Sequence, residues 1–319
     1  MNAANQVAVS PPVAMLFVVG LFVWMLFRPK SKAPAKIFLF IAATLAFGPI
    51  SIRVMDWENA AFPLKFDNHL FLIDRAIGIS AFSVARYLTP GMRSFLFVVY
   101  ETLGYWMILW YGLNLALKRG RPKQVAIAFA IAYGLAPLFY LVVPACGPRH
   151  AFGSVFPMGN PAVAAVTTPL AYWPNAIPSL HMATAILLVY FSGGSRMLRA
   201  FGWIYAAGTA LSTLAFEHYL IDLVVAVPYA FFVIAAADGL WSEALRNAVV
   251  VLAWLAGIRF ATPQLIQVPL VAPALCLATV AQAVLRRGAV TGRNGQSSET
   301  VVESPSQAPS GSLERLPVR

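Results

Sequence analysis

The sequence predicts an all-α protein, a polytopic bundle of transmembrane helices, and two observations lead to that prediction. First, 60% of the 319 residues are hydrophobic and only 11% are charged, whereas soluble domains carry about 25% charged residues. Second, the apolar residues form successive stretches close to the roughly 20 residues that a helix needs to cross a bilayer. A surface that faces lipid explains both observations, so we expect an integral membrane protein.

Nine stretches are candidate spans. In chain order they are Pro12–Phe27, Ala33–Ile52, Ser94–Leu117, Gln124–Ala145, Ser179–Phe191, Phe201–Phe216, Leu220–Ala236, Asn247–Phe260 and Ile266–Leu285. Several are near the lower length limit, so the prediction is eight or nine spans. The first stretch follows an uncharged segment and precedes basic residues, which is typical of a retained span rather than of a cleaved signal peptide.

Two segments differ from the spans. Asp56–Pro90 is mixed in composition, and its apolar residues recur at helical spacing around Leu70, Ile73 and Ile77, which predicts an interfacial helix. From Arg286 onward Ser, Pro, Gly, Gln and Glu dominate, and this composition is typical of a disordered tail.

The formal net charge is +11, and the distribution of the basic residues predicts a membrane orientation rather than nucleic-acid binding. The basic residues stand in short runs between apolar stretches, not on one polar face. If successive loops alternate sides, 16 of the 23 Lys and Arg residues fall on one side. Positively charged loops stay inside, so we expect that side, with the C-terminal tail, to be cytoplasmic. All four histidines then lie on the extracytoplasmic side or at its membrane edge.

Three polar segments are expected to meet on this extracytoplasmic side. They are Cys146–His150 after one span, Pro178–His181 at the start of the next, and Glu217–Asp222 at the start of a later one. Burying ionisable groups at membrane depth costs free energy, so such groups are first considered as functional residues. The sequence therefore places a candidate site at the external membrane face.

The residue types in these segments suit phosphate chemistry. His218 and Asp222 are four residues apart on one helix face, where a carboxylate fixes the imidazole tautomer and makes the other nitrogen a better nucleophile. Ser179 is expected to cap a helix with His181 in its first turn, and helix N-termini suit phosphate. Arg149 can grip phosphate oxygens through two N–H groups.

Other interpretations of these residues remain open. A histidine at a span end, such as His69 or His150, is more often an interfacial polar residue than a catalyst. A metal-dependent membrane hydrolase would use His150, His181, His218 and Asp222 as ligands, although a short ligand motif such as HExxH is lacking. A transporter would line its pathway with the same polar groups. Two cysteines, Cys146 and Cys276, lack metal-ligand spacing and are expected to be unbridged thiols.

Pro178-Ser-Leu-His181 together with His218-Tyr-x-x-Asp222 resembles the type-2 phosphatidic acid phosphatase superfamily. The Leu of the first motif, the His-Tyr form of the second and the upstream Gly-Pro-Arg resemble its inositol phosphorylceramide synthase branch, whose members are inositolphosphotransferases. The resemblance implies a six-span catalytic core at residues 34–236. Residues 1–33 would add an N-terminal span and a basic loop, 237–285 further spans, and 286–319 the cytoplasmic tail.

The resemblance also implies roles. His218 would be the nucleophile that forms a phosphohistidine, Asp222 would orient it, and His181 would protonate the leaving oxygen. Ser179 and Arg149 would bind phosphate oxygens of a lipid substrate. No metal and no cofactor are expected, and the sequence indicates no particular protein partner.

Three departures from the superfamily's hydrolases are visible. Leu180 stands where they often carry Gly, and Ser212 stands where they carry an Arg six residues before the nucleophile. Their Lys-x6-Arg-Pro motif is not found before Pro148 and Arg149. The expected phosphate pocket is therefore less basic, which favours a phosphodiester over a phosphomonoester and transfer over hydrolysis.

Overall fold

Helices form nearly all of the regular structure, as the sequence predicts. The computed structural model describes residues 33–116, 120–159, 161–268 and 270–282, all within the first of two compact units, Met1–Ala283 and Val284–Arg319. The predicted span Pro12–Phe27 and the predicted disordered tail lie outside the described residues. The strands β1 (Leu64–Lys65) and β2 (Thr168–Pro169) form one short antiparallel pair.

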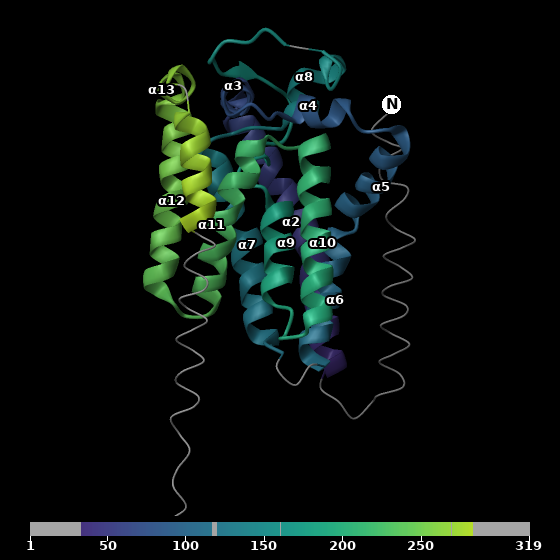
Figure 1. Cartoon of the computed structure of the whole chain (residues 1–319). Coiled ribbons are helices and arrows are strands. Elements are labelled where there is room, and N and C mark those ends of the chain that lie inside the picture. The colour runs from purple at the N-terminus through teal and green to yellow at the C-terminus, as the bar shows by residue number, and fades with distance from the viewer. Residues whose placement is uncertain (1–32, 117–119, 160, 269, 283–319) are drawn as a thin grey trace, which may run out of the picture. The chain divides into compact units, whose positions relative to one another are not determined.

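The helices follow the order of the predicted spans (Figure 1). Their bounds are α2 Ala33–Ala61, α3 Asp67–Ile77, α4 Ala81–Arg86, α5 Pro90–Glu101, α6 Leu103–Ala116, α7 Pro122–Val142, α8 Pro148–Phe152, α9 Leu180–Tyr190, α10 Arg196–Phe216, α11 Leu220–Ala237, α12 Trp241–Phe260 and α13 Thr262–Gln267, with a 3₁₀ turn at Gly153–Val155 and a last described helix at Val271–Gln282.

By length and composition alone, fewer helices qualify as spans than the sequence predicts for this part of the chain. Four described helices, α2, α7, α11 and the α12–α13 stretch, are long and apolar enough to cross a membrane, and α5 with α6 makes a fifth if this pair, bent by 48°, counts as one span. The sequence predicts seven or eight here, since one of its eight or nine spans, Pro12–Phe27, lies outside the described residues. α9 is only 11 residues long, because Ser179 caps its start and the helix ends before Gly193 and Gly194. α10 contains Arg, Ser and Thr residues that lower its apolarity.

The surface of the bundle is apolar, as expected for a protein in lipid. α11 lies at the centre, with most of its residues buried, and it packs against α12, α9 and α7. α12 in contrast exposes large apolar side chains, Trp241, Leu245, Val249 and Leu252, at three- and four-residue spacing. Such a stripe faces lipid in an integral membrane protein.

The segment Asp56–Pro90 contains short helices, as predicted, but the apolar face of the first of them is covered by protein. α2 continues to Ala61, and two short helices, α3 and α4, follow. Leu70 and Ile73 on α3 are fully buried, and α3 packs against α8, α11 and α13. The apolar face of α3 thus covers protein rather than lipid, because its neighbours in space come from the second half of the chain.

Candidate active site

The three polar segments meet at one end of the bundle, where α8 and the starts of α9 and α11 lie together (Figure 1). The backbone N–H of Ala176 donates to the carbonyl of Ala145 at 3.0 Å, which joins the first segment to the approach to the second. The backbone N–H of Ser179 donates to the carbonyl of Asp222 at 3.4 Å, which joins the second segment to the third. Helices that run in alternate directions bring these distant residues to one plane.

His218 and Asp222 form a buried pair at the start of α11. The Nδ1 atom of His218 lies 3.3 Å from Oδ2 of Asp222, and both side chains are nearly inaccessible to solvent. The same carboxylate oxygen accepts the backbone N–H of Tyr219 at 2.9 Å, so Asp222 also closes the first turn of the helix. Because Asp222 engages Nδ1, the Nε2 atom of His218 is the nitrogen left for chemistry.

His181 faces His218 from the first turn of α9. The centroids of the two imidazole rings are 6.1 Å apart, at an interplanar angle of 61°. Tyr100 of α5 stacks on His181, with 3.9 Å between ring centroids, and so restrains its ring plane. A reacting group typically sits about 3–3.5 Å from each catalytic atom, so one phosphoryl group could contact both histidines.

Ser179 and Arg149, the two predicted phosphate-binding residues, both have partners within the protein. Ser179 is fully buried and caps α9, with its hydroxyl accepting the backbone N–H of Met182 at 3.3 Å. Arg149 on α8 is partly exposed, and its Nη1 donates to Oε1 of Glu217 at 3.1 Å. The prediction that Ser179 caps a helix is confirmed. Arg149 binds the carboxylate of Glu217, the residue before His218.

Helix α3 organises the site, a role that sequence reasoning missed. The Asp67 carboxylate accepts the backbone N–H groups of Cys146 and Gly147, at 3.1 and 2.8 Å, and the hydroxyl of Tyr219 at 2.9 Å. Two turns along, Asp74 accepts the N–H groups of Leu220 and Ile221, at 2.7 and 3.0 Å, and so caps α11. Asp67 therefore joins the first and third segments of the site, and Asp74 attaches the third segment to α3.

Burial governs the electrostatics of these supporting groups. It raises the pKa of Asp67 to about 6, an effect that the N–H and O–H donors partly oppose. Burial likewise raises the pKa of Asp74 well above its ordinary value. Burial together with the charge of Asp67 raises the pKa of the Cys146 thiol, which therefore stays protonated and is not a nucleophile.

The site contains no metal cluster among the residues that the structure describes, since no group of three or more His, Cys, Asp or Glu side chains there could hold an ion. Of the ligands that a metal hydrolase would use, His150 bonds instead to Glu217, with 3.0 Å between its Nε2 and Oε2. His69 lies buried on α3, its ring 5.0 Å from Phe66. Cys146 and Cys276 are both free thiols, as expected.

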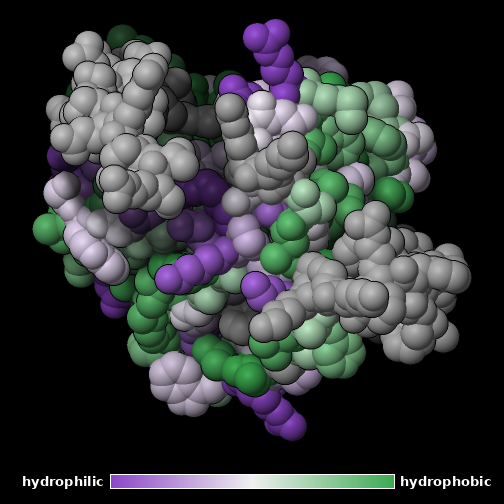
Figure 2. All heavy atoms as spheres, turned by 90° about the horizontal axis from the view of Figure 1, so that it is seen from below, coloured by the Kyte–Doolittle hydropathy of each residue, from purple (hydrophilic) through white to green (hydrophobic). Residues whose placement is uncertain are grey.

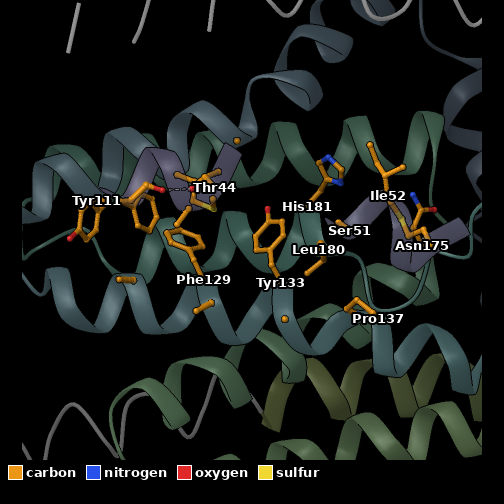
Figure 3. Close-up of a pocket in the computed structure, with 18 of the residues that line it drawn as sticks. Thr44, Ser51, Ile52, Tyr111, Phe129, Tyr133, Pro137, Asn175, Leu180 and His181 are labelled. Carbon is orange, nitrogen blue, oxygen red and sulfur yellow. Dashed lines mark hydrogen bonds between the residues drawn. The ribbon is translucent and has the colours of Figure 1, made fainter. Parts of the chain in front are cut away.

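A large apolar cavity extends from the histidine pair. It has a volume of about 960 Å³, and His181, His218 and Leu180 form part of its wall. Figure 3 shows its labelled lining residues in a row between α2 and α7, from Tyr111 and Thr44 at one end to Ile52 and Asn175 at the other. Arg149 and Ser179 are not among the lining residues. The cavity thus joins the two imidazoles to a space suited to hydrocarbon.

Gly147 permits the close approach between the first and third segments. Its φ is +87°, and a Cβ atom there would lie 1.9 Å from the carbonyl oxygen of Glu217. We therefore expect Gly147→Ala to lower thermal stability and activity together. Gly78→Ala is the matched control, because Gly78 has a φ of +89° with nothing near its Cβ position.

The control should lose only the roughly 1–2 kcal/mol of a left-handed alanine, whereas Gly147→Ala should lose clearly more. Thermal unfolding of the purified variants measures both. Equal losses would show that the contact with Glu217 does not constrain the site.

The fold and the site together define an integral membrane protein with paired histidines beside an apolar cavity. A comparison with protein families identifies the class more closely: the PAP2 superfamily matches residues 68–236, just over half of the chain. The chain belongs to this superfamily, which indicates a lipid phosphatase or phosphotransferase. Searches of curated proteins and of solved structures gave no match.

Proposed function

We propose that the protein is a lipid phosphotransferase that moves a phosphate-bearing headgroup from a phospholipid to an alcohol through a phosphohistidine at His218. Within the superfamily this corresponds to the branch of the inositol phosphorylceramide synthases. One observation carries the proposal: His218, held by Asp222, faces His181 at the wall of an apolar cavity. The six-span core at residues 34–236 belongs to the same proposal, with the shorter α9 and the less apolar α10 as spans beside α2, the α5–α6 pair, α7 and α11.

In the first step, Nε2 of His218 attacks phosphorus and forms a P–N bond while the P–O bond to the lipid breaks. His181 gives its proton to the departing oxygen. The carboxylate of Asp222 holds the proton on Nδ1 and stabilises the positive charge that develops on the ring. Arg149 and Ser179 are proposed to bind the non-bridging phosphate oxygens, for which Arg149 has to exchange its contact with Glu217.

In the second step, His181 takes the proton of an acceptor hydroxyl, and the acceptor oxygen attacks phosphorus. The P–N bond breaks, and both histidines return to their starting states. An alcohol acceptor gives transfer and water gives hydrolysis, so the surroundings of the phosphohistidine decide the outcome. General acid–base help of this kind contributes about 10²–10⁴-fold to the rate.

The surroundings support transfer. The cavity wall beside His181 is apolar and includes Leu180, which disfavours water and suits an acyl chain. Ser212 is fully buried, and its hydroxyl bonds to the carbonyl of Thr209 in its own helix at 2.9 Å. The position where related hydrolases carry an arginine therefore adds no positive charge, which favours a monoanionic phosphodiester over a dianionic monoester.

The product ratio tests the proposed function. Purified protein receives a labelled phosphodiester lipid, with and without an excess of a lipid alcohol. We expect the labelled headgroup to appear mainly on the alcohol and its release into water to fall when the alcohol is added. Release of a free phosphoalcohol at a rate that the acceptor leaves unchanged would assign the protein to the hydrolases.

We also propose that the active site faces the extracytoplasmic side and that the C-terminal tail is cytoplasmic. Figure 2 shows the opposite end of the bundle, where hydrophilic side chains stand among apolar ones. Lys36, Lys123 and Arg196, which are exposed near the starts of α2, α7 and α10, belong to the side with more positive charge.

Cysteine labelling in intact cells tests this orientation, because both natural cysteines are buried. Ser154→Cys, near the site, should react with a membrane-impermeant maleimide. Lys123→Cys, at the other end, should react only after the membrane is permeabilised. Both positions are exposed in the structure. The reverse pattern would invert the proposed orientation.

A further inference from the structure

Glu217 binds Arg149, the residue proposed to bind the substrate's phosphate. Its Oε1 accepts Nη1 of Arg149 at 3.1 Å and its Oε2 lies 3.0 Å from Nε2 of His150. Both partners are on α8, whereas Glu217 directly precedes His218 in the chain. The Glu217 side chain is 19% exposed and the Arg149 side chain 36%, so the ion pair is partly shielded from water.

A carboxylate in this position resembles part of a phosphate, since both present two oxygens to a guanidinium. The substrate's phosphate must therefore share Arg149 with Glu217 or displace the carboxylate from it. Glu101 is also close enough to Glu217 to interact with it electrostatically. The positive charge of Arg149 is thus largely offset before any substrate binds.

This arrangement discriminates between substrates by charge. A phosphodiester carries one negative charge, whereas a phosphomonoester near neutral pH carries nearly two. Repulsion from a fixed carboxylate increases with the charge of the bound phosphate, and it is strong where water is partly excluded. His150 holds the second oxygen of Glu217, so the carboxylate stays directed at Arg149.

We propose that Glu217 is a specificity-determining residue that admits monoanionic phosphodiesters and excludes dianionic phosphomonoesters. This inference rests on the proposed function and assigns its choice of donor to one side chain. A purely structural role for Glu217, tying α8 to the start of α11, makes a different prediction, because loss of structure would slow the reaction of all substrates alike.

Glu217→Gln separates the two roles, since glutamine keeps the shape and the hydrogen bond to Arg149 but removes the charge. The rate constant kcat/KM is measured with two lipids of identical acyl chains, phosphatidic acid as the monoester and phosphatidylmethanol as the diester. In the variant we expect the monoester-to-diester ratio of kcat/KM to rise by about tenfold or more. Glu243→Gln is the matched control.

Glu243 also pairs with an arginine, Arg246, at 3.0 Å, and the two side chains are 26% and 38% exposed. Its replacement on α12 should leave the ratio at the wild-type value. An unchanged ratio in an active Glu217→Gln enzyme overturns this inference and leaves the proposed function standing. Inactivity of the wild-type enzyme on both lipids overturns the proposed function instead.

A measurement on the wild-type protein covers the case in which the variant does not fold. Dimethyl phosphate, a monoanion, should inhibit more strongly than the inorganic phosphate dianion at equal ionic strength and pH. Stronger inhibition by inorganic phosphate would overturn the inference without any substitution.

Discussion

Replacement of His218 by glutamine is expected to reduce turnover by at least about 10⁴-fold, because the variant lacks the nitrogen that attacks phosphorus. Glutamine keeps a similar length and can still donate a hydrogen bond to Asp222, so the start of α11 should remain folded. Initial rates with a labelled phosphodiester lipid measure the loss, and thermal unfolding shows whether the variant is intact.

His69→Gln is the control for this substitution, because His69 is also a buried histidine at the same end of the bundle. Its activity should stay within a few-fold of the wild type once differences in folded fraction are corrected. A His218→Gln enzyme that is folded and retains near-wild-type turnover would remove the proposed nucleophile.

Replacement of His181 by glutamine is expected to slow the reaction of an ordinary phospholipid by about 10²–10⁴-fold, the usual contribution of a general acid. The loss should depend on the leaving group. A phosphodiester with a p-nitrophenyl group needs little protonation of its departing oxygen, so formation of the phosphohistidine should be slowed much less. Release of p-nitrophenol in the first turnover measures this step directly.

The comparison between the two histidine variants assigns their roles. An activated leaving group should restore the first step in His181→Gln and should leave His218→Gln inactive. Equal losses on both substrates in His181→Gln would show that His181 does not protonate the leaving oxygen. In that case, the stacking of Tyr100 on His181 would stabilise the fold without positioning a general acid.

The meeting of the site segments could be predicted from the sequence, and the reason is topological. Alternating spans return the chain to one membrane face, so Arg149, His181 and His218 had to share a plane if the spans were assigned correctly. The His218–Asp222 contact followed from helical spacing alone. Ser179 as a cap followed from its place before an apolar run.

The contribution of α3 could not be read from these patterns. Asp67 bonds to Gly147 and Tyr219, which are 80 and 152 residues away in the chain. The available signal was the seven-residue spacing of Asp67 and Asp74, which puts two carboxylates on one helix face of a chain poor in charge. That spacing does not tell which distant N–H groups the carboxylates accept.

Fewer helices than predicted reach the length of a span, because hydropathy does not report where a helix ends. Ser179 and the glycines at 193 and 194 limit α9 to 11 residues. The pairing of Glu217 with Arg149 was missed for a related reason, since the two residues are 68 positions apart and on different elements. Tertiary packing, not local pattern, brings them together.

The most direct test of the central claim is detection of the covalent intermediate. His181→Gln is mixed with an activated phosphodiester donor and stopped in alkali, in which a phosphohistidine survives, and its peptides are analysed by mass spectrometry. Because this variant forms the intermediate but lacks the base that activates an acceptor, the intermediate should accumulate. We predict an adduct of phosphate plus headgroup on His218. Leaving-group release with the adduct on another residue, or with none on His218, would contradict the proposed mechanism.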